Sequence, residues 1–388
     1  MKKDIRILID ATGSSGWIGG VYHKKNILFS LRQNQWIRDN CRICVVTNPE
    51  HKELFSEFDG VSVYTISYKG LREKKIRIAA LLAIHRCTHM FPNIDSRICS
   101  RLHVTGINWV PDYQHYHYPE YFTQADLDEH RRTDIMTIDT GYPLILSSQS
   151  CLNDFRRYVS KTKENVYVVP FVSYIEKEIR NLSDDYVAEV CAKFGTKPHK
   201  YIMIANQFWQ HKNHTVVFEA IKRLSNAGSD RNNTVPDDIR FVFTGEVSDY
   251  RSGEYADTIR AYLNDPYISD RCICTGFIDR KEQLALMRGA RFLIQPSLFE
   301  GWGTVLEDAK VLDKCVLLSD IPIHREQMSE ECTLFDPQDA DELARMILYT
   351  LDNKRLCDNV DYGIENMYSD ARDYSTEFER MLRSQLSR

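Results

Sequence analysis

The residues with the clearest chemical potential lie in one short stretch, SLFEGWGTVLEDAK, at residues 297–310. Glu300 precedes a Gly-Trp-Gly turn, and two adjacent acids, Glu307 and Asp308, follow it. Thr304 and Glu307 have the T-x-x-E spacing of a capping box, which predicts a helix that begins at Thr304. Glycines before a helix leave N–H groups at the positive end of its dipole, where a phosphate binds well. Acids on either side of such a turn suggest a ligand with phosphates and hydroxyls, such as a sugar diphosphate.

The two adjacent acids cannot serve the same ligand equally. Neighbouring residues on a helix point about 100° apart at ~3.6 residues per turn. We expect Glu307 to cap its own helix, which leaves Asp308 for the ligand.

A second candidate segment, IANQFWQHKNH at residues 204–214, follows a predicted strand. Lys212 stands where a helix is expected to start, and a cation is unfavourable at a helix N-terminus unless an anion lies near it. We interpret Lys212 as a phosphate ligand. The alternative is a lysine exposed to solvent.

Aromatic residues, two histidines and two acids crowd into WVPDYQHYHYPEYF at residues 109–122, which we expect to be one loop. His115 and His117 form an H-x-H pair, but no third metal ligand is apparent nearby. The alternative is that the aromatic residues pack on a neighbouring helix and the histidines have no role in a site.

Short apolar runs alternate with helix-compatible segments along the whole chain, which predicts an α/β fold with parallel sheets. Two sets of runs predict two Rossmann-like, doubly wound domains, at residues 1–172 and 173–365, with a helix at 366–388 crossing back onto the first. Ligands of such sheets bind beyond the carboxyl ends of the strands. We therefore expect the two domains to face a cleft. The runs are 5–10, 42–48, 61–67, 144–148, 166–170, 201–206, 239–245, 271–276, 291–297 and 314–320.

The bulk composition is that of a globular protein: 388 residues, a net charge of −5 and 43% hydrophobic residues. The acidic balance argues against a nucleic-acid partner. The first residues lack the apolar core of a signal peptide, and no run approaches the ~18 apolar residues of a membrane span, so we expect a cytoplasmic protein. The eleven cysteines lie mostly in apolar runs and are interpreted as small buried hydrophobic residues.

The stretch PSLFEGWGTVLEDAKVLDKCVLLSDIPIHREQ resembles the signature of the retaining glycosyltransferase family 4, which has the GT-B fold. That family carries two glutamates with seven residues between them. The first implies a contact with the donor sugar, and the second a contact with the nucleotide ribose. Counting from Glu300, the second position falls on Asp308, so the ribose ligand is Glu307 or Asp308.

The same resemblance extends to other segments. It implies a basic residue five positions before Lys212, where this chain has Gln207, with both directed at the donor diphosphate. It implies that His115 or His117 faces the donor sugar, and that the backbone near Ile278 lies beside the nucleobase. The glycine pair 19–20 resembles a loop that approaches the donor phosphate. The implied catalytic residues are Glu300, Lys212, His115 and His117, and the implied donor-binding residues are Gly19, Gly20, Asn206, Gln207, Ile278, Gly301, Trp302, Gly303, Thr304, Glu307 and Asp308.

The activity that the resemblance implies is hexosyl transfer with retention, from a UDP- or GDP-sugar to a glycan or lipid-linked glycan in surface polysaccharide synthesis. Examples are lipopolysaccharide and its O-antigen. The resemblance implies that the N-terminal domain binds the acceptor and the C-terminal domain binds the nucleotide sugar. No cofactor is implied, and the reaction is expected to be independent of metal. The alternatives are a nucleotide-sugar epimerase or hydrolase on the same fold, and a sugar-nucleotide-binding protein that has lost catalysis.

Residues 69–101 hold eight Lys and Arg against two acids. Lys74, Lys75 and Arg77 flank an apolar run, which predicts a basic amphipathic helix. Its interpretation is either a solvated helix face or peripheral contact with an anionic membrane, on the inner face of the membrane.

Overall fold

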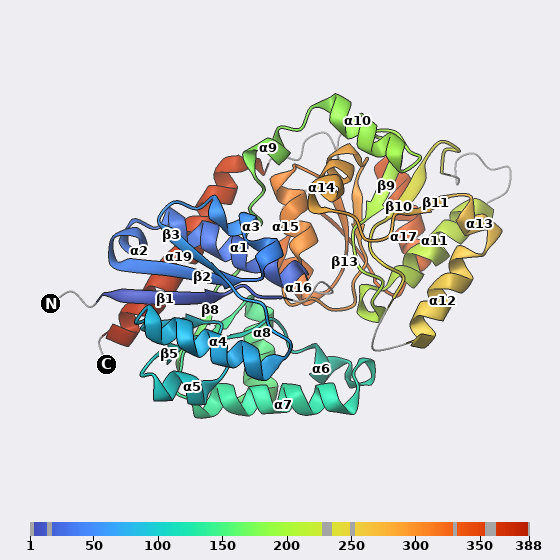
Figure 1. Ribbon diagram of the computed structural model, residues 1–388. Helices are drawn as coiled ribbons and strands as arrows, with labels where there is room; N and C mark the ends of the chain where they lie inside the picture. Colours follow the sequence, from blue (N-terminus) through green and yellow to red (C-terminus); the bar gives the residue numbers. More distant parts are fainter. Residues whose placement is uncertain are drawn as a thin grey trace. The chain divides into compact units, whose positions relative to one another are not determined.

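The protein is represented by a computed structural model that describes residues 4–13, 18–226, 235–248, 253–328, 332–353 and 362–386 (Figure 1). The chain forms two compact units. Unit 1 comprises residues 1–117, 124–174 and 365–388, and unit 2 comprises residues 118–123 and 175–364.

Unit 1 is built on two parallel sheets, with strand orders β3-β2-β1-β4-β5 and β6-β7-β8. The strands are β1 (Ile5–Asp10), β2 (Cys41–Thr47), β3 (Val61–Thr65), β4 (His89–Phe91), β5 (Thr105–Gly106), β6 (Asn108–Val110), β7 (Leu144–Leu146) and β8 (Val166–Val168). The helices are α1 (Ile18–Gln33), α2 (Gln35–Asn40), η2 (Pro49–His51), α3 (Glu53–Ser56), α4 (Leu71–Ile84), α5 (Ser96–Arg101), α6 (Gln114–His117), α7 (Gln124–Asp139), α8 (Gln149–Asp154) and η4 (Phe155–Val159).

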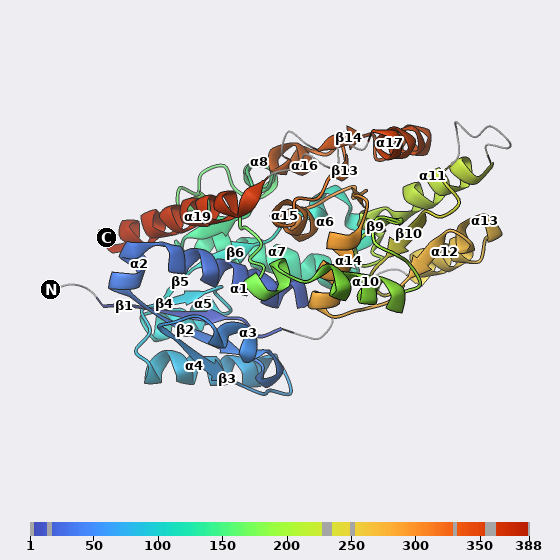
Figure 2. The same cartoon turned by 90° about the horizontal axis from the view of Figure 1, so that it is seen from above.

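The last helix of the chain, α19 (Gly363–Leu386), packs on unit 1 beside α2 (Figures 1 and 2). Asn34 donates from Nδ2 to the Glu379 carboxylate at 2.9 Å, and the Arg383 guanidinium lies 4.4 Å from the Trp36 ring centre. Phe378 is fully buried and meets Phe91, the last residue of β4, edge to face. The C-terminal segment therefore completes the core of the first unit.

Unit 2 contains one six-stranded parallel sheet with the order β11-β10-β9-β12-β13-β14. The strands are β9 (Tyr201–Ile204), β10 (Arg240–Phe243), β11 (Cys272–Cys274), β12 (Leu293–Gln295), β13 (Val316–Ser319) and β14 (Thr333–Phe335). The helices are η3 (Pro119–Tyr121), α9 (Lys177–Arg180), α10 (Asp184–Lys193), η5 (Gln210–Lys212), α11 (His214–Asn226), α12 (Gly253–Leu263), α13 (Pro266–Ser269), α14 (Arg280–Gly289), α15 (Thr304–Val311), α16 (Pro322–Gln327) and α17 (Ala340–Asp352).

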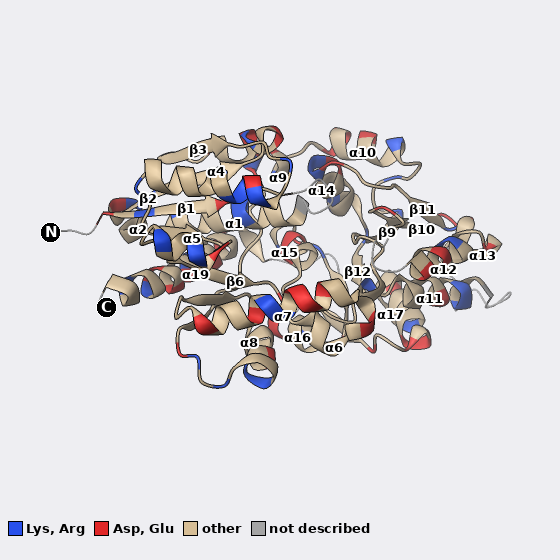
Figure 3. Ribbon diagram, turned by 60° about the horizontal axis from the view of Figure 1, so that its bottom comes forward, with Lys and Arg blue, Asp and Glu red and all other residues tan. Residues whose placement is uncertain are grey.

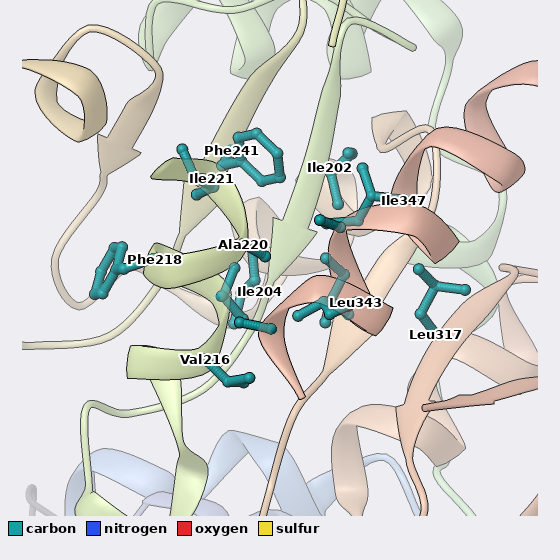
Figure 4. Close-up of a cluster of buried hydrophobic side chains, with 14 of the residues drawn as sticks. Ile202, Ile204, Val216, Phe218, Ala220, Ile221, Phe241, Leu317, Leu343 and Ile347 are labelled. Atoms are coloured by element: carbon teal, nitrogen blue, oxygen red, sulfur yellow. The ribbon is translucent and has the colours of Figure 1, made fainter. Parts of the chain in front are cut away.

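The core of unit 2 lies between one face of this sheet and the helices α11 and α17 (Figure 4). Ile202 and Ile204 are two residues apart in β9 and so point to the same face, where they meet Ile221 of α11 and Leu343 of α17. All four side chains are at most 1% exposed. Burial of aliphatic residues on both faces of the strands explains why the runs read as continuous apolar stretches in the sequence.

The α/β prediction with parallel sheets in two units is confirmed, and each of the ten predicted runs contains a strand. Four short strands, β4, β5, β6 and β14, were not predicted. The prediction of a single loop at 109–122 is wrong, because Trp109 lies in β6 and residues 114–117 form α6. The four unpredicted strands have two or three residues each, too few to show a periodic pattern.

Candidate functional site

The strongest cluster of polar side chains in unit 2 lies where β9 and β12 end. The two strands are neighbours in the sheet, so the residues that follow them meet at its carboxyl edge. Asn206 and Gln295 bond to each other in both directions, with N–O distances of 2.9 and 3.3 Å. This paired amide bridge is buried and joins the ends of the two strands.

The Glu300 carboxylate is the centre of the cluster. Its Oε1 atom accepts hydrogen bonds from Lys212 Nζ at 2.6 Å, Ser297 Oγ at 2.7 Å and Gln295 Nε2 at 3.0 Å. Among the described residues, no hydrogen bond reaches the other oxygen, Oε2. The side chains of Lys212 and Glu300 are 16% and 8% exposed. The carboxylate is therefore held by one oxygen, and the second oxygen remains for another donor.

Burial would raise the pKa of Glu300, but the charges of Lys212 and His211 and the bonds from Lys212 and Ser297 lower it to about 2. The carboxylate is thus ionised in the folded protein at any pH above that value. Its contribution to stability is fully present above the ordinary pKa of 4.5 and is lost as the pH falls through about 2.

The segment that carries Lys212 is fixed against the loop that carries Glu300. Asn213 adopts the left-handed region with φ of 55°, which asparagine tolerates better than most residues. Its side-chain amide donates to the carbonyls of Pro296 at 3.1 Å and Pro337 at 2.8 Å. The amide of Leu298 donates to the carbonyl of His211 at 2.8 Å. These bonds explain how an ion pair between positions 88 residues apart is held in place.

Helix α15 begins at Thr304 as predicted, but the capping box is wrong. Gly303 is the N-cap residue, none of the described side chains caps the helix, and Thr304 is the first helical residue. The Gly303 amide, expected to face a phosphate, donates to Gln327 Oε1 at 2.9 Å. The amides of Thr304 and the next residues have no capping side chain and remain suited to an anion.

The two acids of α15 are each about 1% exposed and each has a protein partner. Glu307 accepts from Gln327 Nε2 at 2.8 Å and from Lys310 Nζ at 2.9 Å, and does not cap the helix. Asp308 is bound through both oxygens by the guanidinium of Arg280. A contact of Asp308 with a ribose would therefore require Arg280 to share this carboxylate.

Gln207, expected to face the donor phosphates, accepts a hydrogen bond at Oε1 from the Glu246 amide at 3.0 Å. Its loop packs against Gly245, which has φ of 111°. A Cβ at Gly245 would lie 2.6 Å from the Asn206 carbonyl oxygen. Gly245 thus permits the close approach of two strand ends, a role that the sequence analysis missed.

His324 was also missed by the sequence analysis. It is fully buried, and its Nδ1 lies 2.8 Å from the Ser319 carbonyl, so Nδ1 carries the proton. Burial lowers its pKa, while the charge of Glu300 opposes that shift. Its Nε2 is buried without a hydrogen-bond partner in the described chain, which places a neutral acceptor close to the Glu300 cluster.

The remaining predicted residues of unit 2 lie on loops near the same strand ends. Ile278 is half-buried in the turn between β11 and α14, and Gly301 and Trp302 lie between Glu300 and α15. The Lys310 ammonium lies 5.9 Å from the Trp302 ring centre.

The predicted residues of unit 1 have partners within that unit. The His115 ring stacks on His130 at 4.3 Å, and its Nε2 lies 3.5 Å from the Asp134 carboxylate. His117 Nε2 lies 2.9 Å from the carboxylate of Asp154. Gly19 is exposed and Gly20 is buried, both in the first turn of α1. In the ranges that the structure describes, no three metal-ligating side chains gather in one place.

The sequence and structure comparisons agree on the type of fold. Residues 192–367 match the family model "Glycosyl transferases group 1". No curated protein matches the chain by sequence.

Solved structures match nearly the full length of the chain. Anabaena Alr3699/HepE in complex with UDP-glucose has a TM-score of 0.72 at 15% identity, covering 99% of this chain and 100% of that one. Sucrose-phosphate synthase from Thermosynechococcus elongatus has a TM-score of 0.69 at 16% identity, covering 99% of both chains. The apo lipopolysaccharide outer core galactosyltransferase WaaB has a TM-score of 0.57 at 15% identity, covering 98% of this chain and 100% of that one. The fold is therefore GT-B.

The Lys212–Glu300 pair is expected to dominate the stability of the strand ends. Lys212→Met should lower the free energy of unfolding by about 3–5 kcal/mol, because it leaves a buried carboxylate without its cation. Adding Glu300→Gln should recover part of that loss, with a coupling energy of about 1–3 kcal/mol in a urea-unfolding double-mutant cycle at pH 7.

The matched control is the exposed pair Arg260–Asp257 of α12, with side-chain exposures of 57% and 78%. Its coupling energy should be at most about 0.5 kcal/mol. Equal coupling energies for the two pairs would contradict the central role of Glu300.

Proposed function

We propose that this chain, whose residues 192–367 match the model of the glycosyl transferases group 1 family, is a retaining hexosyltransferase that uses a UDP- or GDP-sugar. The observation that carries this proposal is the Glu300 carboxylate. It is ionised, desolvated and held through Oε1, so that Oε2 can accept a hydrogen bond from a hydroxyl of the donor sugar. A preorganised acceptor of this kind discriminates a sugar from water by its fixed direction.

The donor diphosphate would be met by Lys212, Gln207 and the first amides of α15. Lys212 bonds to Glu300 in the present structure, and its three N–H groups allow it to keep that bond while donating to a phosphate oxygen. The uncapped first turn of α15 adds backbone donors and the positive end of a helix dipole. These groups would stabilise the charge of the leaving diphosphate, and we propose that the reaction needs no metal ion.

The reaction would proceed by attack from the front face. The bond between the anomeric carbon and the diphosphate oxygen breaks while the acceptor oxygen bonds to the same face of that carbon. The leaving phosphate oxygen takes the proton of the acceptor hydroxyl. The configuration is retained, and the charge that develops on the phosphate falls on Lys212 and the α15 amides.

The nucleotide and the acceptor are the finer parts of the proposal. The ribose would bind near Asp308 or Glu307, and the base beside Ile278. HepE binds UDP-glucose, and WaaB is a lipopolysaccharide galactosyltransferase. Their fold is therefore compatible with a nucleotide-sugar donor and with a lipid-linked glycan acceptor. By analogy we propose a glycan or lipid-linked glycan acceptor in surface polysaccharide synthesis.

A transfer assay with UDP- and GDP-sugars tests this proposal. Glu300→Gln should lower kcat about 10²–10³-fold, the usual cost of removing one polar group that faces the reacting centre. The matched control Glu189→Gln, at an exposed position of α10, should keep full activity. Release of nucleoside diphosphate should require an acceptor.

Two other results would replace the proposal. An epimerised sugar nucleotide, or free sugar formed equally without acceptor, would make the chain an epimerase or hydrolase. Tight nucleotide-sugar binding with no product under any condition would make it a binding protein.

The basic residues for which the sequence suggested a membrane contact are paired within unit 1, so a contact would depend on exposed apolar side chains of α4 instead. Lys74 pairs with Asp10 and Lys75 with Asp95, both at 2.9 Å, while Arg77 pairs with Glu73 of its own helix. The apolar side chains that α4 exposes are Leu71 at 62%, Ile76 at 61% and Ile84 at 71%. Acidic residues also alternate with basic ones along α7 (Figure 3).

We propose that Ile76 and Ile84, which lie about 80° apart around α4, rest on the cytoplasmic side of a membrane. None of the described helices is long and apolar enough to cross one. Ile76→Ser with Ile84→Ser should at least halve co-sedimentation with vesicles of phosphatidylglycerol, because two apolar side chains would no longer insert into the membrane surface. Unchanged co-sedimentation, or no binding by the unmodified protein, would contradict the contact.

A further inference from the structure

Unit 1 holds a buried lysine that has no counter-ion in the part of the chain that the structure describes. Lys24, in the second turn of α1, is 4% exposed, and its ammonium lies 3.9 Å from the ring centre of Trp109. Neither a hydrogen bond nor an ion pair links this ammonium to any residue that the structure describes. The next residue, Lys25, is 1% exposed but pairs with Glu57 at 2.7 Å. Two adjacent buried lysines therefore differ in that only one has a carboxylate.

The carboxylate whose charge acts on Lys24 is already engaged. Asp10, the last residue of β1, accepts at Oδ1 from the amide and hydroxyl of Thr12, at 3.0 and 2.6 Å. Its Oδ2 pairs with Lys74 at 2.9 Å. One carboxylate thus faces two ammonium groups, and the cluster carries one positive charge in excess.

This imbalance is costly in a buried place, because a desolvated cation without a partner loses its hydration and gains little in return. Burial lowers the pKa of Lys24 to about 7. The negative charge of Asp10 raises this pKa in part, and the positive charge of Lys74 lowers it further. An anion bound beside Lys24 would supply the missing charge and restore the ammonium form.

A second side chain at the same indole also lacks a hydrogen-bond partner among the described residues. His23 is 7% exposed and stacks on Trp109 at 4.3 Å. Neither of its ring nitrogens has a hydrogen-bond partner in the described chain. Burial lowers its pKa far below the ordinary value, so the ring is neutral and offers one donor and one acceptor.

The position of these residues is that of a ligand site in parallel sheets. Asp10 ends β1, Phe91 ends β4, and Lys24 Nζ lies 6.0 Å from the Phe91 ring centre. Trp109 lies in β6, the first strand of the second sheet. Ligands of such sheets bind beyond the carboxyl ends of the strands.

We propose that Lys24, supported by Lys74 and His23, binds an anionic group, phosphate or carboxylate, of the acceptor. This inference rests on the proposed function; it assigns the acceptor to unit 1 and makes the acceptor an acidic or phosphorylated sugar. The ammonium of Lys24 donates to the anion, and the neutral imidazole of His23 adds an uncharged donor beside it.

Calorimetric titration of the full chain tests the site with D-glucose 6-phosphate, D-glucuronate, inorganic phosphate and D-glucose. At least one of the three anionic probes should bind, and glucose should bind at least about tenfold more weakly than the best of them. Lys24→Met should weaken that binding about tenfold or more, the cost of losing one charged hydrogen bond. The matched control Lys52→Met, an exposed lysine of the same unit, should stay within about twofold. The preference between phosphate and carboxylate identifies the group.

Lys24→Met replaces an uncompensated buried cation with an apolar side chain of similar length, so its Tm should not fall. If the variant nevertheless unfolds, the titration of isotope-labelled Lys24 in the unmodified protein decides: its pKa should rise when the best anionic probe binds. Absence of binding by all three anionic probes, equal losses in both variants, or an unmoved pKa would overturn the inference.

UDP and GDP are titrated in parallel, since they report on unit 2. Nucleotide binding without anion binding would overturn the acceptor site and leave the proposed function standing. Anion binding without nucleotide binding would support the anion site and count against the donor site.

Discussion

The ion pair between Lys212 and Glu300 is the constraint on which the rest of unit 2 depends. A buried ion pair stabilises a fold only when further hydrogen bonds satisfy its atoms, because both charges lose their hydration. Here Ser297 and Gln295 add donors to the same carboxylate oxygen, and Asn206 holds Gln295 in place. This arrangement requires β9 and β12 to be neighbours, and the sheet order supplies that. The remaining carboxylate oxygen, the uncapped turn of α15 and the lone acceptor of His324 are then directed by a rigid frame.

The two units differ in how their buried charged side chains are paired. In α15, Asp308 has Arg280 and Glu307 has Lys310 and Gln327, so every buried acid of that helix is matched inside the protein. In unit 1, Lys25 has Glu57, whereas Lys24 has an aromatic ring and, among the described residues, no anion. A matched charge with further hydrogen bonds can stabilise the fold, while an unmatched buried charge lowers stability until a ligand binds. We interpret the unmatched charge of Lys24 as one that serves ligand binding.

Much of the fold could be predicted from the sequence, because strands buried on both faces form continuous apolar runs that stand out from amphipathic helices. Glu300 and Lys212 could also be singled out, since each is a charged residue just after a strand. Partners that come from distant segments could not be predicted. No local pattern indicates that Arg280 binds Asp308, that Gln327 takes the Gly303 amide, or that Lys74 and Lys75 turn inward to Asp10 and Asp95. The T-x-x-E spacing misled partly for the same reason: Glu307 bonds to Gln327 of another segment, as well as to Lys310 of its own helix.

The central claim is that the Lys212–Glu300 cluster is a nucleotide-sugar site, and thermal stabilisation by nucleotides tests it most directly. The full chain and Lys212→Met would be melted with UDP, GDP and their glucose and mannose conjugates, without added metal. A ligand at ~100 times its dissociation constant stabilises the folded state by ~2.7 kcal/mol, which shifts Tm visibly. The account predicts that one nucleotide series raises the Tm of the unmodified chain and that Lys212→Met removes the shift. No shift by any nucleotide, or an undiminished shift in Lys212→Met, would contradict it.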